Sequence, residues 1–126
     1  AHTAQAREIM GPDALLCVEQ KCIRTTDKDL AYRLADEQLG MYASLPNYRN
    51  SWLRLGFTEA EIDDRAPRFL DAVVAWGDEA AVRGRIQEHL DAGADQVAIQ
   101  PIMDHDAIAA GRIDPILEAL DALGPD

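Results

Sequence analysis

The feature that most constrains the fold is a pair of strand-like segments, at 15–24 and 96–101, separated by a long helical stretch. The second segment follows a helix with a defined start at Asp78 and a stop at Gly93, which is the pattern of one αβ unit in a parallel α/β fold. Two parallel strands cannot form a self-sufficient sheet. The sequence therefore predicts part of a larger α/β body, either the tail of a longer enzyme or one subunit of an obligate assembly.

Helical patterns fill the stretch 27–92 and the end of the chain at 104–123. Roughly 70 residues separate the two strands, whereas an ordinary crossover needs one helix, so this crossover carries a helical insertion. No linker or repeat divides the chain. We therefore expect 1–126 to be a single domain or a fragment of a barrel.

Local signals predict where the helices begin, end and face the core. Val82, Ile86 and Leu90 recur every four residues and indicate a buried stripe, and Gly84 among them is expected where another backbone comes close. Capping residues or boxes predict helix starts at Thr3, Thr26-x-x-Asp29, Thr58-x-x-Glu61 and Asp78. Gly124-Pro125 is expected to end the last helix. The chain opens on Ala1 rather than Met, directly before the cap at Thr3, which is the pattern of a trimmed sequence.

The charge balance excludes two classes of partner. Lys and Arg total 12 against 23 Asp and Glu, for a formal net charge of -11. Such a surface repels phosphate backbones and anionic membranes, so we expect no nucleic-acid partner and no membrane partner. Cys17 and Cys22 lie at an odd spacing in one predicted strand, so their side chains point to opposite faces. Both are interpreted as buried free thiols, which fits a reducing cytoplasm.

Candidate site residues lie at the ends of the two strands, because ligands of parallel α/β folds bind at the carboxyl ends. The sequence predicts that 23–25 and 100–102 face one mouth. Gln96, Ala98 and Gln100 alternate with apolar neighbours and would point into a barrel. Gln100 is then a candidate hydrogen-bond donor to a ring-shaped ligand. The alternative is that it satisfies neighbouring polar groups of the strands.

Other chemical groups have both a functional and a structural interpretation, and the residues favour the structural one. Glu19 alternates with Lys21 on one strand face, where the two can pair, although catalytic use of Glu19 is a second interpretation. The run 48–52 mixes aromatic and cationic residues as a lid would, or as an interface or helix edge would. Asp104-His105-Asp106 lacks a distant ligand, so no metal site is predicted and Asp104 is expected to cap a helix.

Four segments carry a family resemblance. They are Leu-Pro-Asn-Tyr-Arg-Asn at 45–50, Leu-x-Leu-Gly-Phe-Thr-Glu at 53–59, Ala-Trp-Gly-Asp at 75–78 and Asp-Ala-Gly-Ala-Asp at 91–95. Together they resemble the C-terminal part of luciferase-like monooxygenases, above all actinobacterial members that use the deazaflavin coenzyme F420.

The resemblance implies a place for each strand in a helix-rich part of a (β/α)8 TIM barrel. That barrel needs roughly 250 residues, about twice this chain. The resemblance makes 15–24 the seventh strand and 96–101 the eighth, with the insertion between them. The family's main catalytic and cofactor-phosphate contacts lie in its first six strands, so no catalytic residue is carried over. The resemblance implies that this chain retains only part of the cofactor or substrate site, around Gln100 and the insertion.

Two functions from different classes follow. In the first, the chain is the C-terminal fragment of an oxidoreductase or monooxygenase that uses flavin mononucleotide (FMN) or F420 on a small organic substrate, and is inactive when isolated. In the second, it is a non-catalytic α/β module that self-associates or binds a partner. Open strand edges need covering, so either function predicts a homo-oligomer or contact with the remainder of the barrel.

Overall fold

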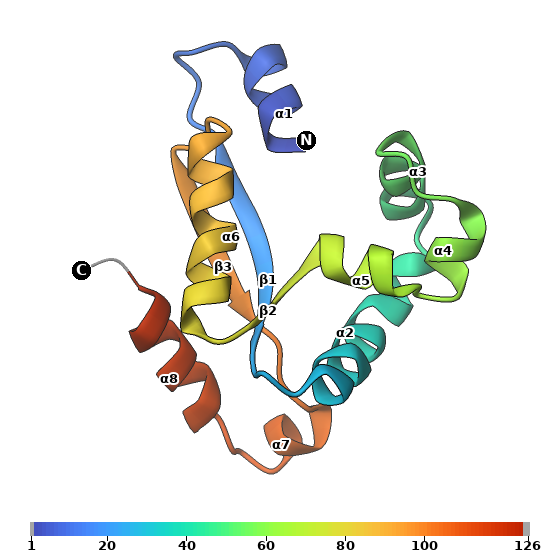
Figure 1. Ribbon diagram of the computed structural model, residues 1–126, viewed down its shortest axis with the longest axis vertical. Helices are drawn as coiled ribbons and strands as arrows, with labels where there is room; N and C mark the ends of the chain where they lie inside the picture. The colour runs from blue at the N-terminus through green and yellow to red at the C-terminus, as the bar shows by residue number, and fades with distance from the viewer. Residues whose placement is uncertain (1, 125–126) are drawn as a thin grey trace.

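The computed structural model describes residues 2–124, which form eight helices and three strands (Figure 1). The helices are α1 (His2–Met10), α2 (Lys28–Ala43), α3 (Pro46–Arg54), α4 (Glu59–Asp63), α5 (Pro67–Val73), α6 (Glu79–Asp91), α7 (His105–Ala109) and α8 (Asp114–Leu123). The strands are β1 (Cys17–Arg24), β2 (Val74–Gly77) and β3 (Gln96–Pro101). No helix among the described residues is both long and apolar enough to cross a membrane. Ala1 and Pro125, on which two sequence predictions rest, lie outside the described residues.

The three strands form one small open parallel sheet in the order β2-β1-β3, so the fold is a helix-rich mixed α/β arrangement. β1 is the central strand and pairs with every residue of β3. β2 pairs only with Lys21–Arg24, the carboxyl half of β1. A closed (β/α)8 barrel keeps consecutive strands side by side. Here the first strand of the chain lies between the second and the third.

β2 was not predicted, because the whole stretch 27–92 was expected to be helical. A short apolar run after a helix has no period that separates a strand from a helix end. The structure ends α5 at Val73 and gives Val74 an extended backbone, with φ -115° and ψ 126°. Gly77 closes the strand at φ +138°, where an added Cβ would lie 2.6 Å from the Cβ of Ala81. The two predicted strands are confirmed, with the first beginning at Cys17.

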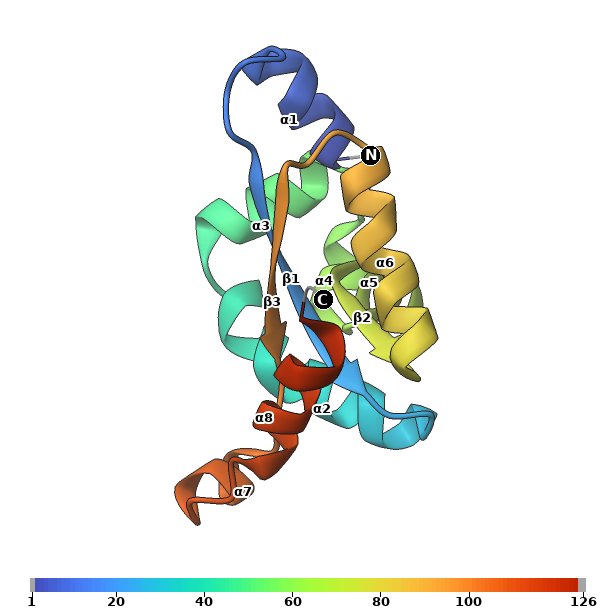
Figure 2. The same ribbon diagram turned by 90° about the vertical axis from the view of Figure 1, so that its left-hand side faces the viewer.

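The helices cover the two faces of the sheet unequally (Figures 1 and 2). α6 and α8 pack on one face, where Cys22 and Val82 are buried. α2, α3 and α5 form the larger core against the carboxyl half of the other face, around Ile23, Leu39 and Phe69. The amino half of that second face is exposed. One face of the sheet is therefore complete and the other is only half covered.

Several helix predictions are confirmed and others need correction. Asp78 caps α6 and the Thr58 capping box opens α4, as predicted. Asp27, not the preceding threonine, caps α2, because its carboxylate accepts the backbone N–H groups of the first turn. Thr3 lies inside α1 instead of capping it. An added Cβ at Gly84 would meet nothing within 4 Å, so no backbone approaches there.

The predicted stripe of α6 is buried only at its start. Val82 is fully buried, Ile86 is half-buried, and Leu90 is 38% exposed. The exposed end of the stripe lies beside β3 in a groove that no described residue fills. Cys22 is buried and Cys17 is exposed, so the opposite-face prediction is confirmed, whereas the prediction that both thiols are buried is wrong for Cys17.

Substitution of Phe69 tests the larger core. Its ring is fully buried and meets Trp52 and Phe57 edge to face, with ring centres 4.8 Å and 5.4 Å away. We expect Phe69→Ala to lower the free energy of unfolding by about 3–5 kcal/mol, because it removes apolar contacts and leaves a cavity. Urea unfolding measures the change. Leu117→Ala, at a side chain 53% exposed, is the control and should change stability by less than about 0.5 kcal/mol. Equal losses in both variants would contradict this core.

Candidate functional site

A crevice of about 380 Å³ opens at the carboxyl ends of β1 and β3, and we call it the carboxyl-edge crevice. Its walls come from α2 on one side and α8 on the other, and the loop between β3 and α7 closes one end. The sequence predicted that 23–25 and 100–102 face one mouth. Five of these six residues line the crevice, and Gln100 is the exception.

The crevice lies where the chain leaves two neighbouring strands on opposite faces of the sheet. After β1 the chain enters α2, which packs with the larger core. After β3 it passes through α7 to α8, which packs with α6 on the other face. In open parallel sheets, ligands bind outside the carboxyl ends at such a divergence. The topology therefore favours this crevice over the other hollows of the surface.

Charged side chains form the rim of the crevice. Arg24 Nη2 lies 3.4 Å from Glu118 Oε2, and Arg33 Nη1 lies 3.2 Å from Asp104 Oδ2. The backbone N–H of Asp106 and then the guanidinium of Arg33 lower the pKa of the Asp104 carboxyl. Both arginines stay at least one-third exposed, so their remaining donors face solvent at the mouth. Anions that enter the crevice can compete for these donors.

The floor of the crevice is apolar. Ile23, Leu34 and Ile102 are buried there, each at most 8% exposed. Cys22 also lines it, and burial raises the pKa of its thiol to about 11. A thiol with so high a pKa remains protonated near neutral pH and is a poor nucleophile. The crevice thus offers an apolar surface beneath two guanidinium groups.

Gln100 lies on a separate surface, which we call the polar sheet face. This face carries the alternate residues of β1 and β3 that point away from α6: Cys17, Glu19, Lys21, Gln96, Ala98 and Gln100. Lys21 Nζ donates to Glu19 Oε1 at 2.7 Å and also to Gln100 Oε1. The predicted pairing of Glu19 with Lys21 is confirmed. The amide oxygen of Gln100 is occupied by Lys21.

Aromatic residues of the insertion reach the polar sheet face. Lys21 Nζ lies 5.0 Å from the centre of the Tyr42 ring, which meets Tyr48 edge to face. Trp52 is only 8% exposed and belongs to the larger core. Asn50 is exposed. Aromatic packing against Tyr42 and the larger core therefore holds the run 48–52 in place.

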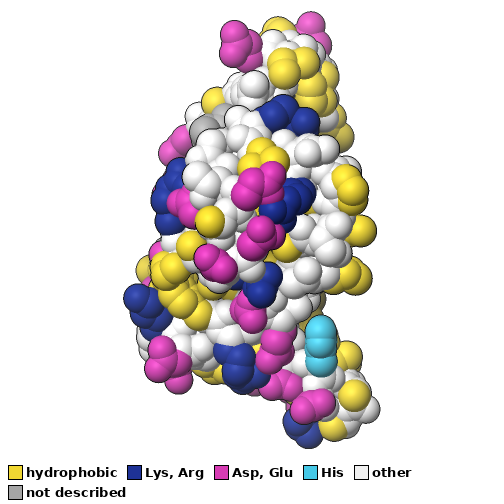
Figure 3. Space-filling model, turned by 90° about the vertical axis from the view of Figure 1, so that its right-hand side faces the viewer, with side chains coloured by type: hydrophobic (Ala, Val, Ile, Leu, Met, Phe, Trp, Pro, Cys, Tyr) yellow, Lys and Arg dark blue, Asp and Glu magenta, His cyan; other side chains and the backbone are white. Residues whose placement is uncertain are grey.

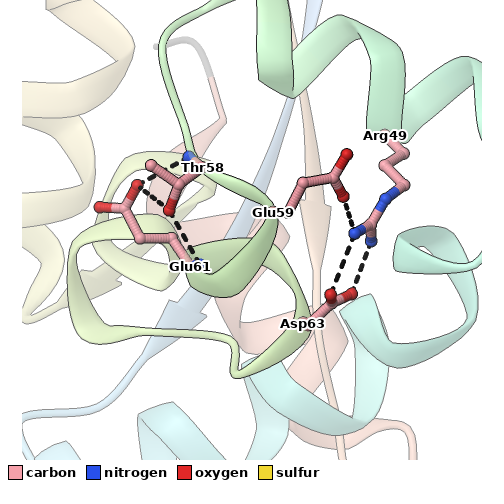
Figure 4. Close-up of polar contacts among 5 residues, drawn as sticks. All are labelled: Arg49, Thr58, Glu59, Glu61 and Asp63. Carbon is pink, nitrogen blue, oxygen red and sulfur yellow. Dashed lines mark hydrogen bonds and ion pairs between the residues drawn. The ribbon is translucent and has the colours of Figure 1, made fainter.

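Ion pairs hold the outer side of the insertion. The guanidinium of Arg49 pairs with Glu59 and with Asp63, whose Oδ1 lies 2.7 Å from Arg49 Nη1 (Figure 4). Beside this cluster, Glu61 accepts the backbone N–H of Thr58 at 2.8 Å. Figure 3 shows basic and acidic side chains interspersed over one side of the molecule. Arg49 is thus engaged within the insertion instead of pointing toward the crevice.

The histidines do not converge, and among residues 2–124 no group of three His, Cys, Asp or Glu side chains could hold a metal ion. His105 is exposed in the first turn of α7. Asp104 caps α7 by accepting the backbone N–H groups of Asp106 and Ala107, as the sequence predicted. The acidic run at 104–106 therefore shapes a helix start.

Sequence reasoning missed a buried polar network around His89. Thr3 Oγ1 lies 2.7 Å from Nδ1 of the imidazole, and Gln20 Oε1 lies 2.8 Å from its Nε2. Because the Gln20 oxygen can only accept, Nε2 carries the proton and Nδ1 accepts from Thr3. Thr3 and Gln20 are 3% and 4% exposed. Only the polar character of three residues far apart in sequence hinted at this link between α1, β1 and α6.

The two cysteines give an internal test of the crevice floor. Cys17 is exposed on the polar sheet face, whereas Cys22 is buried with a raised pKa. We expect iodoacetamide at mildly alkaline pH to modify Cys17 at least tenfold faster, because the reagent needs an accessible thiolate. Peptide mass mapping over time measures both rates in one sample. Urea should make the two rates similar, and rapid native labelling of Cys22 would contradict the buried floor.

The His89 network predicts a pH dependence of stability. Burial, and next the charge of Arg85, lower the pKa of His89 from its ordinary value of 6.5, while Glu88 opposes and His2 adds to the shift. Below pH about 6.5 the unfolded chain then binds more protons than the folded chain. The free energy of unfolding therefore decreases as the pH decreases. The stabilisation that neutral His89 provides is complete above the pKa of its imidazole in the unfolded chain. It is lost as the pH falls through the pKa of the imidazole in the folded chain.

Urea unfolding between pH about 7.5 and 5 measures this slope, above the range in which carboxylates titrate. We expect His89→Asn to flatten it. His105→Asn, at an exposed histidine, should leave it unchanged. A slope that is the same in the two variants would contradict the role given to His89.

Comparison with protein-family models, with curated proteins and with solved structures finds no match to this chain. What the chain binds must therefore be inferred from the carboxyl-edge crevice, the polar sheet face and the resemblance of its sequence.

Proposed function

We propose that the chain is the C-terminal part of a luciferase-like oxidoreductase, and that its carboxyl-edge crevice holds part of an FMN or F420 cofactor together with a small organic substrate. The observation that carries this proposal is the crevice itself, with its apolar floor and its two rim arginines at the carboxyl ends of neighbouring parallel strands. The cofactor would supply the hydride or oxygen chemistry, and the protein would bind and orient it.

The chemistry of the crevice fits such a cofactor. FMN and F420 each join a flat ring system to a phosphate group. Ile23 and Ile102 offer an apolar surface to a ring. Arg24 and Arg33 offer guanidinium donors to a phosphate, which arginine binds in a planar, two-pronged geometry. A volume of about 380 Å³ is at the small end of ligand pockets, so it accommodates only part of the cofactor together with its substrate.

The polar sheet face supports a larger parent protein. Parallel sheets are normally covered on both faces. Here Cys17, Glu19, Gln96 and Ala98 are exposed on one face. In a (β/α)8 barrel this face would line the interior. In the barrel, the strand that precedes β1 would pair with the edge of β1 that β2 occupies here. β2 would then have to leave that edge, because two strands cannot pair with one edge at the same time.

Fluorescence titration with FMN and with F420, oxidised and reduced, tests the proposal. We expect saturable binding in the micromolar range and at least tenfold weaker binding by Arg33→Gln, since a hydrogen bond to a charged group contributes about 1.5–3 kcal/mol. Arg54→Gln, at an exposed arginine on α3, makes the same charge change outside the crevice and should bind normally. No saturable binding of either cofactor, or equal weakening in both variants, would contradict the proposed site.

A specific observation also favours the second candidate function, a non-catalytic module that self-associates. β3 pairs with β1 alone among the described residues, so its other edge is free to pair. A protein that covers such an edge with a second copy needs no cofactor. Cofactor binding that weakens in Arg33→Gln would distinguish the two candidate functions. A module that only self-associates does not need the arginines at the rim of the crevice.

A further inference from the structure

The outer edge of β3 lacks the features that keep edge strands apart. β3 reads Gln-Val-Ala-Ile-Gln-Pro, without a charged side chain, and its proline is the last residue. Natural proteins usually block an edge with lysine, with internal proline or with a bulge. Figure 2 views the sheet from the side on which β3 lies. The backbone of β3 is therefore able to accept another strand.

An apolar groove runs beside this edge between α6, β3 and α8. It measures about 500 Å³, and its apolar lining includes Ile86, Leu90, Val97, Ile99 and Leu123. The side chain of Leu90 is 38% exposed there. A strand that pairs with β3 would place side chains over this groove and bury it. A second strand would thus pair with the backbone of β3 and bury the apolar groove beside it at the same time.

The order of side chains in β3 identifies the occupant. Gln96, Val97, Ala98, Ile99 and Gln100 read nearly the same in both directions. If two copies pair antiparallel about Ala98, Gln96 lies opposite the partner's Gln100 and Val97 lies opposite the partner's Ile99. Like side chains then meet on each face, with amides on the polar sheet face and β-branched residues on the groove face. Such opposed pairs stabilise antiparallel strands.

The charged side chains at the two ends of the groove are of opposite sign, so they match under the same twofold rotation about Ala98. Arg83 lies at the end near α8, where it pairs with Glu79 and donates to the carbonyl of Ala122. Asp95 lies at the other end, before β3, where it pairs with Arg7. Antiparallel pairing brings Arg83 of each copy toward the partner's Asp95. A twofold interface requires this kind of self-complementarity, because one patch must fit itself.

We propose that two copies of this chain associate through their β3 edges, antiparallel and centred on Ala98, so that their three-stranded sheets become one continuous sheet. The interface uses the β3 edge and the groove between α6, β3 and α8. It lies apart from the carboxyl-edge crevice. This inference gives the self-association candidate its surface and does not depend on cofactor binding. In a closed (β/α)8 barrel the first strand would pair with the same edge of β3, so the interface is proposed for this chain by itself.

Sedimentation velocity over a concentration series tests the proposal with a pair of charge variants. Ala98 is exposed, so Ala98→Lys and Ala98→Glu should leave the folded monomer intact. Each variant places two like charges face to face across the twofold axis, and we expect dimerisation to weaken at least tenfold. Mixing the two variants should restore dimers, because opposite charges then meet. Ala60→Lys, at an exposed residue of α4, should dimerise as the unmodified chain does.

Ionic strength gives a second readout. Each copy carries a formal net charge of -11, so added salt should strengthen the dimer by screening repulsion. A monomer at every concentration would overturn the proposal. So would a dimer that Ala98→Lys leaves unchanged, or a mixture of the two variants that stays monomeric. FMN and F420 binding, measured on the same variants, should remain that of the unmodified chain, which separates failure of this interface from failure of the crevice.

Discussion

The position of β1 at the centre of the sheet is the constraint on which the rest of the structure depends. Its consecutive residues Cys22 and Ile23 are buried in different cores on opposite faces. Its backbone pairs with β2 on one side and β3 on the other. Its Gln20 side chain joins the carbonyl of Val73 to His89. Loss of β1 would therefore separate both cores, both neighbouring strands and the buried polar network at once.

This central strand also explains why the candidate site lies where it does. The carboxyl end of β1 adjoins that of β3, and the following segments diverge to opposite faces of the sheet. Divergence leaves a hollow that neither α2 nor α8 fills. Arg24 and Arg33 place two guanidinium groups at this hollow, and each is paired there with a carboxylate, Glu118 or Asp104. An anionic ligand must therefore compete with these carboxylates for the guanidinium donors.

Local patterns in the sequence predicted much of this arrangement. The bounds of β3 followed from strict alternation between two turns, and the caps at Asp78 and Thr58 followed from side chains that reach backbone N–H groups nearby. The carboxyl-edge crevice could be predicted because parallel strands present their ends on one edge. These features depend on residues close together in the chain.

Features that depend on distant residues were not predictable in this way. β2 has four residues and no periodic pattern, so it becomes a strand only because β1 offers a free edge. The His89 network joins residues 69 and 86 positions apart in the chain. Gln100 was a candidate ligand donor, with satisfaction of neighbouring strand polar groups as the alternative, and its contact with Lys21 is of the second kind and depends on the register of β1 with β3. Register and pairing partners are set by tertiary packing, which a single sequence does not display.

The proposed function depends on the binding of a flat, anionic cofactor at the carboxyl-edge crevice. The most direct test is an NMR titration of ¹⁵N-labelled chain with FMN, because backbone shifts report which residues the ligand approaches. We expect the largest changes to fall on Arg24, Thr25, Ile102 and Asp104, with the polar network around His89 unaffected. Changes centred on His89 or on β3 alone, or none at saturating FMN, would contradict it.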